Sequence, residues 1–318
     1  MPYELEDKLV IGIASSALFD LSESDKIFRE QGEEAYREYQ QDHLYDTLEP
    51  GVAFPFIQRL LSLNDLGTKE NPLVEVIVLS HNSPETGLRV LESTKTHGLG
   101  IKRAVFTQGR APFEYMRAFN MSLFLSANKQ DVIQASQEGF PAGQVIGRKN
   151  PHEATDEETS TLNVAFDFDK VIAGPSADES YKELGLDGYH AREDKLAKTA
   201  LETGPLAPLL RGLNEIQDRE DQQKASNPSY ERRLRVSIVT ARSAPADRRV
   251  ITSLLEWELH ANDLFFLGDI SKAKVLQVLK PHIFFDDKID NLEESANTVP
   301  CVYIPASEST SKEMLPQH

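Results

Sequence analysis

The stretch Asn163-Val-Ala-Phe-Asp167-Phe-Asp169-Lys-Val171 determines how the rest of the chain is interpreted. An apolar run ends here in two carboxylates that lie two positions apart. Side chains at positions i and i+2 of a strand face the same side of a sheet, so both carboxylates can converge on one point. That point lies at the carboxyl edge, where open α/β sheets bind ligands. A solvated aspartate pair would look similar, but the flanking apolar residues favour a functional site.

Similar apolar runs recur along the chain and predict ten strands. Most are continuous β-branched or aromatic segments, as expected for strands that are buried on both faces of a parallel sheet. Helical patterns lie between them, for example at residues 55–64, 86–94 and 248–258. This alternation predicts an α/β doubly wound architecture. The expected strands are residues 9–14, 74–80, 103–107, 122–126, 144–147, 163–168, 235–240, 263–267, 282–286 and 301–304.

The two sets of five strands look like copies of one unit. An offset of 153 places residues 22–61 on the segment that begins at Ser176, and an offset of 160 places residues 74–127 on 234–287, both without a gap. Two unrelated domains with similar hydrophobic periods are the alternative, but shared Gly and Pro positions favour duplication. The matched pairs include Gly32 and Gly185, Tyr36 and Tyr189, Gly51 and Gly204, Pro55 and Pro208, Arg89 and Arg249, and Ser93 and Ser253.

The expected fold is therefore α/β with two tandem Rossmann-like halves and mostly parallel sheets. We expect the first half at residues 1–147 and the second at 162–305. Residues 148–161 are polar, acidic and aperiodic, which is typical of a linker. Residues 306–318 are expected to form a flexible tail.

Duplication provides an internal comparison, because positions that do chemistry can survive in one half only. At the strand ends the second half carries four carboxylates and a lysine that the first half lacks. Thr240 does not discriminate, since the first half keeps Ser80 there. The first half has Ala14, Ser16, Pro112, Ser126 and Ala127 where the second has Asp167, Asp169, Lys272, Asp286 and Asp287.

These side chains suit phosphoryl transfer. The adjacent carboxylates Asp286 and Asp287 repel each other, and a bound hard cation such as Mg²⁺ would relieve the repulsion. The remaining carboxylates supply a nucleophile and an acid–base group for an aspartyl-phosphate route. Thr240 could bind a phosphate oxygen, although taken alone it is better explained as a helix N-cap. Taken alone, Lys272 would be a solvated side chain.

Composition narrows the class of protein. Hydrophobic residues make up 40% and charged residues 27%, which excludes a wholly disordered chain. No apolar run approaches the roughly 18 residues of a membrane span, and the acidic N-terminus does not resemble a signal peptide. A single cysteine, Cys301, excludes a disulfide within the chain. We expect a cytoplasmic location.

The net charge of −17 disfavours nucleic acid and anionic membrane surfaces as partners. A phosphate-bearing substrate meets the same adverse field, so its site needs local compensation from a cation, a lysine or backbone N–H groups.

The segments that contain Asp167 and Asp169, Thr240, Lys272, and Asp286 and Asp287 resemble the four motifs of the haloacid-dehalogenase-like (HAD) hydrolase superfamily. The chain as a whole more closely resembles the cytosolic 5′-nucleotidase type I family. The resemblance implies Mg²⁺-dependent hydrolysis of a nucleoside 5′-monophosphate, either AMP or a deoxyribonucleotide, to nucleoside and phosphate. It follows nearly the whole chain in order, through residues 10–20, 165–171, 178–180, 184–187, 204–206, 239–243 and 281–287.

Catalytic roles follow from this resemblance, position by position. Asp167 would be the nucleophile. Asp169 would act as general acid and then as the base that activates water. Thr240 would bind the phosphoryl group, and Lys272 would neutralise charge between the nucleophile and the phosphate.

The metal site is implied in the same way. Asp287 would ligate Mg²⁺ with Asp167 and the backbone carbonyl of Asp169, with Asp286 beside it. Lys170 departs from the superfamily, which often has a small residue there, and its side chain could alter access. A cap insertion is expected at about residues 174–233.

Two other functions stay open: a phosphatase for another small phosphoester, and a nucleotide-binding regulator without turnover. Retention of Asp167, Asp169, Lys272 and Asp287 together argues against a regulator, because binding alone needs no nucleophile.

The first half either packs against the second, covering apolar surface, or binds a nucleotide effector. Packing is favoured, because the single hydroxyl of Ser80 is a weak binding site for a phosphate. Oligomeric state and base preference do not follow from the sequence.

Overall fold

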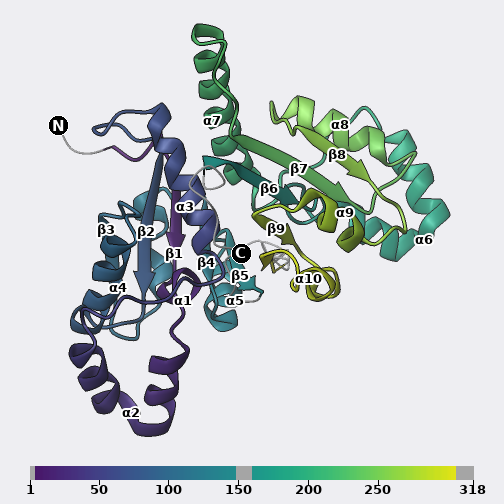
Figure 1. Cartoon of the computed structure of the whole chain (residues 1–318). Helices are drawn as coiled ribbons and strands as arrows, with labels where there is room; N and C mark the ends of the chain where they lie inside the picture. The colour runs from purple at the N-terminus through teal and green to yellow at the C-terminus, as the bar shows by residue number, and fades with distance from the viewer. Residues whose placement is uncertain (1–3, 148–159, 306–318) are drawn as a thin grey trace, which may run out of the picture.

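In the part of the chain that the structure describes, ten strands form a single sheet in the order β3-β2-β1-β4-β5-β10-β9-β6-β7-β8 (Figure 1). The computed structural model describes residues 4–147 and 160–305. Most of the predicted linker and the whole predicted tail lie outside these residues. Below, the first half means residues 4–147 and the second half residues 160–305.

Every predicted strand is present, and its ends lie within two residues of the expected positions. The strands are β1 (Leu9–Ile13), β2 (Val74–Ser80), β3 (Arg103–Phe106), β4 (Leu123–Ser126), β5 (Ala142–Ile146), β6 (Leu162–Phe166), β7 (Leu234–Thr240), β8 (Asp263–Phe266), β9 (Ile283–Asp286) and β10 (Cys301–Tyr303).

The sheet is parallel except where the two halves meet. There β5 and β10 pair antiparallel, with Val302 opposite Val145. From its outer edge to this junction, the first half has the order β3-β2-β1-β4-β5 and the second half the order β8-β7-β6-β9-β10. The sequence predicts a sheet in each half, and the structure joins the two sets of strands into one.

Helices connect the strands. The α-helices are α1 (Ser15–Leu18), α2 (Ser22–Asp42), α3 (Phe54–Ser62), α4 (Pro84–Thr96), α5 (Lys129–Gln137), α6 (Ser176–Lys195), α7 (Ala207–Ser226), α8 (Asp247–Glu256), α9 (Lys272–Leu279) and α10 (Ile289–Ser295). Within the described residues, 3₁₀ turns are η1 (Leu63–Leu66), η2 (Pro112–Tyr115) and η3 (Arg117–Phe119).

Local sequence explains where several helices begin or bend. The Ser83 hydroxyl accepts the N–H of Thr86 at the start of α4, and Pro84 occupies its first turn. Both α2 and α6 are broken by a glycine with positive φ, at Gly32 (89°) and Gly185 (66°). Glycine tolerates this backbone geometry at little steric cost. These two glycines are one of the pairs related by the offset of 153.

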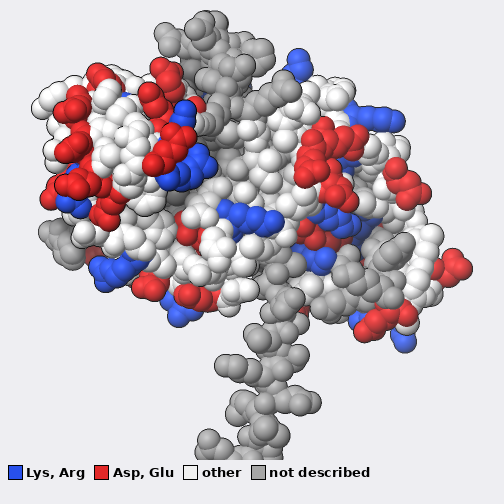
Figure 2. Space-filling view, turned by 90° about the horizontal axis from the view of Figure 1, so that it is seen from below, with Lys and Arg blue, Asp and Glu red and all other residues white. Residues whose placement is uncertain are grey.

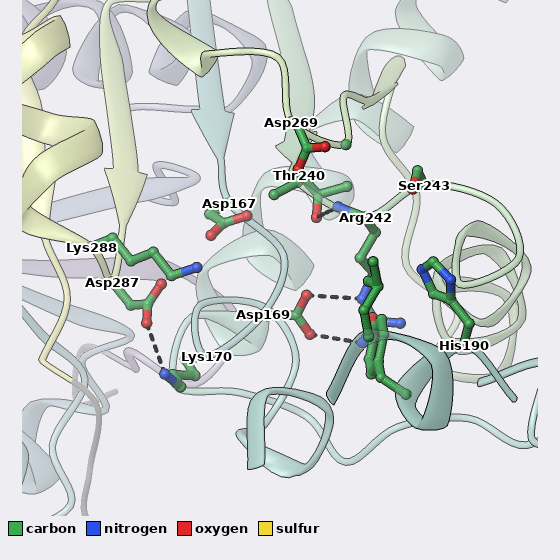
Figure 3. Close-up of a pocket in the computed structure, with 14 residues that line it drawn as sticks. Asp167, Asp169, Lys170, His190, Thr240, Arg242, Ser243, Asp269, Asp287 and Lys288 are labelled. Atoms are coloured by element: carbon green, nitrogen blue, oxygen red, sulfur yellow. Dashed lines mark hydrogen bonds and ion pairs between the residues drawn. The ribbon is translucent and has the colours of Figure 1, made fainter. Parts of the chain in front are cut away.

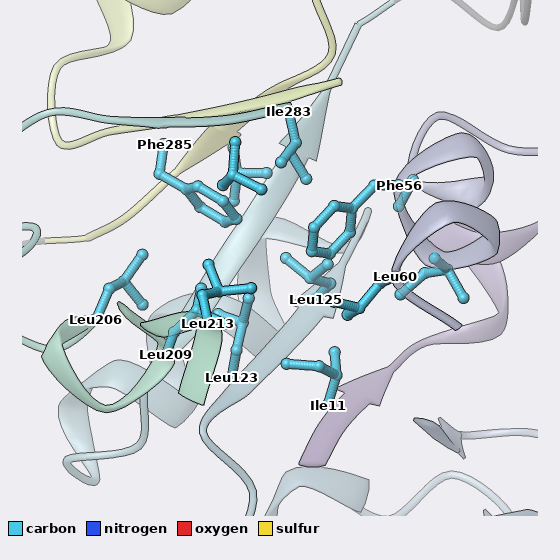
Figure 4. Packing of buried hydrophobic residues seen from close by; sticks show 14 of the residues in the cluster. Ile11, Phe56, Leu60, Leu123, Leu125, Leu206, Leu209, Leu213, Ile283 and Phe285 are labelled. Atoms are coloured by element: carbon cyan, nitrogen blue, oxygen red, sulfur yellow. The ribbon is translucent and has the colours of Figure 1, made fainter. Parts of the chain in front are cut away.

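One hydrophobic cluster extends through both halves (Figure 4). The rings of Phe56 on α3 and Phe285 on β9 meet edge to face, with centroids 6.4 Å apart. Figure 4 shows side chains of both halves around this pair; those of the first half are Ile11, Leu60, Leu123 and Leu125, and those of the second are Leu206, Leu209, Leu213 and Ile283. The halves therefore share this cluster, while a smaller cluster around Phe113 and Phe124 lies within the first half and another around Leu276 and Phe284 lies within the second.

Charge is distributed unevenly over the surface. Seen from below, acidic side chains gather at the left of the molecule, where Figure 1 places α2, and again right of centre, with a group of basic side chains near the middle (Figure 2). Among the residues that the structure describes, no helix has the length and apolarity needed to cross a membrane.

Candidate active site

A cavity of about 420 Å³ opens at the carboxyl ends of the second-half strands (Figure 3). Neighbouring strands β7, β6 and β9 bring their loops together there, because parallel strands end at the same edge. The lining comes from four loops and one helix: Asp167, Asp169 and Lys170; Thr240, Arg242 and Ser243; Gly268 and Asp269; Asp287 and Lys288; and Tyr189 and His190 of α6.

Asp167 is the buried carboxylate of this cavity. Its backbone N–H donates to Phe285 on β9 at 2.7 Å, which fixes the loop directly after β6. Its Oδ1 atom lies 2.8 Å from Lys272 Nζ and accepts the N–H of Phe168 at 2.7 Å. Burial raises the pKa of Asp167 to about 7; Lys272 works against that rise, and the charge of Asp286 adds to it.

Lys272, the first residue of α9, bridges two carboxylates. Its Nζ atom also lies 2.8 Å from Asp286 Oδ2. Burial works to lower the pKa of Lys272, but the charges of Asp167 and Asp286 outweigh it, so the pKa is raised and the ammonium stays charged. The sequence expected this lysine beside Asp167, and the structure brings the two side chains together.

Asp286 and Asp287 have different surroundings. Asp286 is fully buried, and its oxygens accept from Lys272, from Asn291 Nδ2 at 3.0 Å and from the N–H of Lys288 at 2.8 Å. Asp287 lines the cavity and contacts Lys170, whose Nζ lies 3.2 Å from Asp287 Oδ2 (Figure 3). The lysine that departs from the superfamily pattern therefore faces a predicted metal ligand.

The carboxylates of Asp167, Asp286 and Asp287 could hold a cation. One oxygen from each lies within 4.8 Å of the others. Burial raises the pKa of Asp287, since desolvation penalises its charge. An all-oxygen donor set with buried negative charge suits a hard divalent ion, so the residues present fit a metal.

Asp169 lines the same cavity but has a separate partner. Its two oxygens accept from Arg242 Nε and Nη2, each at 2.8 Å (Figure 3). Its carboxylate is not part of the group formed by Asp167, Asp286 and Asp287. The sequence expected both carboxylates of the Asp-x-Asp pair to converge on one point, whereas the structure turns their side chains to different partners.

Arg242 is held in turn by a residue of α6 and by the loop that follows Arg242 in the chain. Its Nη1 atom donates to Glu193 Oε2 at 2.6 Å and to the Ala246 carbonyl at 3.2 Å. Glu193 is fully buried and also accepts from Arg249 Nη1 at 2.7 Å. A chain of alternating charges thus runs from Asp169 into α6 and α8.

Thr240 lies at the end of β7 and is 1% exposed. Its Oγ1 atom accepts the N–H of Arg242 at 3.2 Å. The N-cap explanation for Thr240 is wrong, because α8 begins only at Asp247, with Ala246 at its N-cap. Its position on the cavity wall leaves the hydroxyl available to the site instead.

Sequence reasoning missed the parts played by Arg242 and Glu193. Neither belongs to an Asp-x-Asp pair or a strand-end carboxylate pair. The internal comparison could have found them, since the offsets place Asn82 opposite Arg242 and Gln40 opposite Glu193. Both positions gain charge in the half that carries the carboxylates.

Comparison with known proteins gives one family. The family model described as 5′-nucleotidase matches residues 1–311. Human cytosolic 5′-nucleotidase 1B is 31% identical over 297 residues, a match that covers 92% of this chain and 48% of that protein. The chain thus spans about half the length of that relative.

Among solved structures, histidinol dehydrogenase from Elizabethkingia anophelis aligns with 93% of this chain and 52% of its own, at 10% identity and a TM-score of 0.22. A TM-score of this size supports no inference about fold or function.

Proposed function

The chain belongs to the 5′-nucleotidase family, and we propose that it is a phosphoric monoester hydrolase that converts nucleoside 5′-monophosphates to nucleoside and inorganic phosphate. The observation that carries the proposal is the contact of Lys272 with Asp167, which lines a cavity together with Asp169, Thr240 and Asp287. A carboxylate beside a fixed cation can approach a phosphoryl group that carries negative charge.

In the first step an Asp167 oxygen attacks phosphorus. A bond from that oxygen to phosphorus forms, and the bond from phosphorus to the 5′ oxygen breaks. The leaving oxygen takes a proton from Asp169 and departs as the nucleoside hydroxyl. Lys272 and the Thr240 hydroxyl contact the phosphoryl oxygens, whose charge would otherwise repel Asp167.

In the second step water attacks phosphorus of the aspartyl-phosphate. Water gives a proton to Asp169, which restores the acid for the next cycle. The bond from Asp167 to phosphorus breaks, and inorganic phosphate leaves. The bonds formed and broken and the protons transferred therefore balance over one turnover.

We propose that Mg²⁺ is the cation held by Asp167, Asp287 and the Asp169 carbonyl, with Asp286 beside it. When bound, it neutralises phosphate charge in a protein whose net charge is −17. The support is the group of three carboxylates and their burial. Asp286, which the protein already engages three times, serves chiefly to hold Lys272.

Two tandem HAD-like halves remain part of the proposal, with catalysis in residues 162–305 and a silent half at 1–147. The sequence also predicts a cap over the site at about residues 174–233. Its support is that α6 supplies Tyr189 and His190 to the cavity wall. By contrast, α7 lies in the shared core, so we limit the cap to α6.

We propose AMP or a deoxyribonucleotide as the substrate. We propose the cytoplasm as the location, because the relative named above is described as cytosolic. Purified protein would be assayed on nucleoside 5′-monophosphates and other phosphoesters, with Mg²⁺ and with excess chelator. We expect nucleotide turnover that requires Mg²⁺. Full activity in chelator would exclude the metal, and a strong preference for another phosphoester would exclude the nucleotidase.

Asp167→Asn tests the nucleophile, since an amide is a poor nucleophile. We expect a folded protein with nearly all turnover lost. More than a tenth of wild-type activity would exclude the aspartyl-phosphate route.

Thr240 and Ser80 form a matched pair for the phosphate contact. Each is buried and accepts the backbone N–H two residues ahead, at 3.2 Å in both cases. Thr240→Ala should raise KM and lower kcat, whereas Ser80→Ala removes an equivalent bond away from the site and should not. Altered nucleotide activation in Ser80→Ala would instead indicate effector binding by the first half.

A further inference from the structure

The two oxygens of Asp169 are both occupied, although Asp169 is the group proposed to handle protons. Arg242 Nε and Nη2 take one oxygen each at 2.8 Å. A bidentate pair of this kind fixes both the position and the plane of a carboxylate. To protonate a leaving oxygen, Asp169 must release one of these bonds and turn toward the substrate. The place from which it turns is set by Arg242.

Arg242 is itself immobilised. Its side chain is 2% exposed, and its remaining nitrogen, Nη1, donates to Glu193 and to the Ala246 carbonyl. The guanidinium also lies over the Phe168 ring, 5.4 Å from the ring centroid. With every nitrogen engaged, Arg242 has little freedom to follow Asp169, so it acts as a fixed reference.

The internal comparison separates the packing role of Glu193 from a second role. Arg249 donates to Glu193 Oε1 at 2.7 Å and to the Thr199 carbonyl at 2.9 Å. In the first half Arg89 donates to Gln40 Oε1 at 3.2 Å and to the Asp46 carbonyl at 3.0 Å. These are the same contacts at positions related by the two offsets.

Neutral Gln40 is therefore sufficient to join α2 to α4 in the first half. The second half has a carboxylate at this position, and it also has Arg242 where the first half has Asn82. Packing of α6 on α8 does not explain the extra charge, whereas a second arginine does. Burying Arg242 would be costly without the carboxylates that neutralise it.

We propose that Arg242, held by Glu193, is a positioning residue that sets the orientation of Asp169 for proton transfer to the leaving oxygen. The proposal rests on the function proposed above. It makes α6, which supplies Glu193, part of the machinery that orients the acid. Arg242 acts through Asp169 and is not needed for attack by Asp167.

The test uses two leaving groups. A nucleoside 5′ oxygen needs a proton to depart, whereas p-nitrophenolate departs without one. With enzyme in excess, release of nucleoside from AMP or of p-nitrophenolate from p-nitrophenyl phosphate reports the first step for each. In Arg242→Gln we expect the AMP rate to fall by roughly 10²-fold, the size expected when a catalytic group is misplaced. The p-nitrophenyl phosphate rate should change by less than about threefold, because that step needs no acid.

Two further variants keep the test decisive. Glu193→Gln retains the shape of the side chain and should give a smaller loss with the same selectivity, even if Arg242→Gln folds poorly. Asp169→Asn combined with Arg242→Gln should be no slower on AMP than Asp169→Asn alone, since both act on one proton transfer. Arg89→Gln is the matched control, because it removes the equivalent helix contact in the first half and should leave both rates unchanged.

Equal losses on the two substrates in Arg242→Gln would overturn the positioning role, and so would full additivity with Asp169→Asn or an unchanged AMP rate. Failure of the proposed function looks different: the wild-type protein itself would not release nucleoside from AMP. In that event the variants are compared on the phosphoester that the wild type does hydrolyse, and the same selectivity for poor leaving groups is required.

Discussion

Lys170 shows at the residue scale how one side chain can compete with a metal. Its ammonium lies 3.2 Å from Asp287 Oδ2, and its side chain is 15% exposed. A cation bound by either oxygen of Asp287 competes with the Lys170 ammonium for the negative charge of this carboxylate. Lys170→Met removes the competing charge and keeps a side chain of similar length.

We therefore expect Lys170→Met to bind Mg²⁺ roughly two- to fivefold more tightly, which corresponds to the loss of an ion pair worth about 0.4–1 kcal/mol. Titration calorimetry without substrate measures this directly. Asp287→Ala is the opposite control and should weaken binding. Unchanged or weaker Mg²⁺ binding in Lys170→Met would show that the lysine does not compete at this position.

His282 gives the stability of the fold a pH dependence. Its Nδ1 atom accepts the N–H of Asn163 at 2.8 Å, which requires the neutral ring. Burial and, to a smaller extent, nearby Arg59 lower the pKa of His282 from 6.5 to about 4. Between these values the unfolded chain binds a proton that the folded chain refuses. Stability therefore falls as pH falls through this window, by up to about 3 kcal/mol.

Urea unfolding at pH 7 and pH 4.5 checks this prediction. The wild type should lose more stability between the two pH values than His282→Gln, which cannot be protonated. Equal losses would mean that other groups carry the whole acid sensitivity.

Single residues also show which features of the site the sequence predicts and which it does not. Strand ends and spacing placed Asp167, Lys272 and Asp287 at one edge of the sheet, and they do meet there. The direction of the Asp169 side chain did not follow, because its partner Arg242 lies 73 positions away. Spacing fixes where a residue sits on the backbone, but a rotamer depends on neighbours that only the folded chain provides.

At the scale of elements, the strands were predictable because most are short, largely apolar runs between polar loops. The pairing of β5 with β10 was not. Both strands are partly apolar and sit at the ends of their own sets, and hydrophobic period carries no information about which free edge meets which. The one antiparallel junction is therefore the feature of the sheet that the sequence did not predict.

Gly204 marks a close approach of two loops beside the site. A Cβ atom there would lie 2.4 Å from the Ala173 carbonyl oxygen and 2.8 Å from that of Val171. The Gly204 N–H donates to the Ile172 carbonyl at 2.7 Å. Gly204→Ala must push apart backbone that follows directly on Asp169, so we expect about 1–3 kcal/mol less stability and a lower kcat.

Gly51 supplies the matched control in the first half. A Cβ atom there would lie 2.8 Å from the Ala17 carbonyl oxygen, and the Gly51 N–H donates to the Leu18 carbonyl at 2.8 Å. Gly51→Ala should also destabilise the protein, but kcat of the folded enzyme should stay at the wild-type value. Urea unfolding and steady-state kinetics on both variants separate the two effects. Equal losses of kcat would mean that the loop after Asp169 is not specially sensitive.

At the scale of the whole molecule, the shared cluster gives a structural reason for the presence of the first half, which lacks the strand-end carboxylates of the second. Large apolar side chains of β9 and α7 lie against α3 and β1 (Figure 4). Removing the first half would expose them as one apolar surface, which a soluble protein rarely tolerates. This arrangement favours packing over effector binding as the contribution of residues 4–147.

A core of this kind predicts that the two halves unfold together. The single tryptophan, Trp257, lies in the second half, where its Nε1 donates to the Leu201 carbonyl at 3.1 Å. Its fluorescence therefore reports on that half alone.

Phe56→Ala removes a fully buried ring from the first half, at a cost of about 3–5 kcal/mol in the free energy of unfolding. We expect the urea midpoint seen by Trp257 to fall as far as the midpoint seen by far-ultraviolet circular dichroism, because one cooperative transition links both probes. Two separate transitions, with Trp257 fluorescence unmoved by Phe56→Ala, would show instead that the second half is stable without the first, and that the first half is kept for something other than packing.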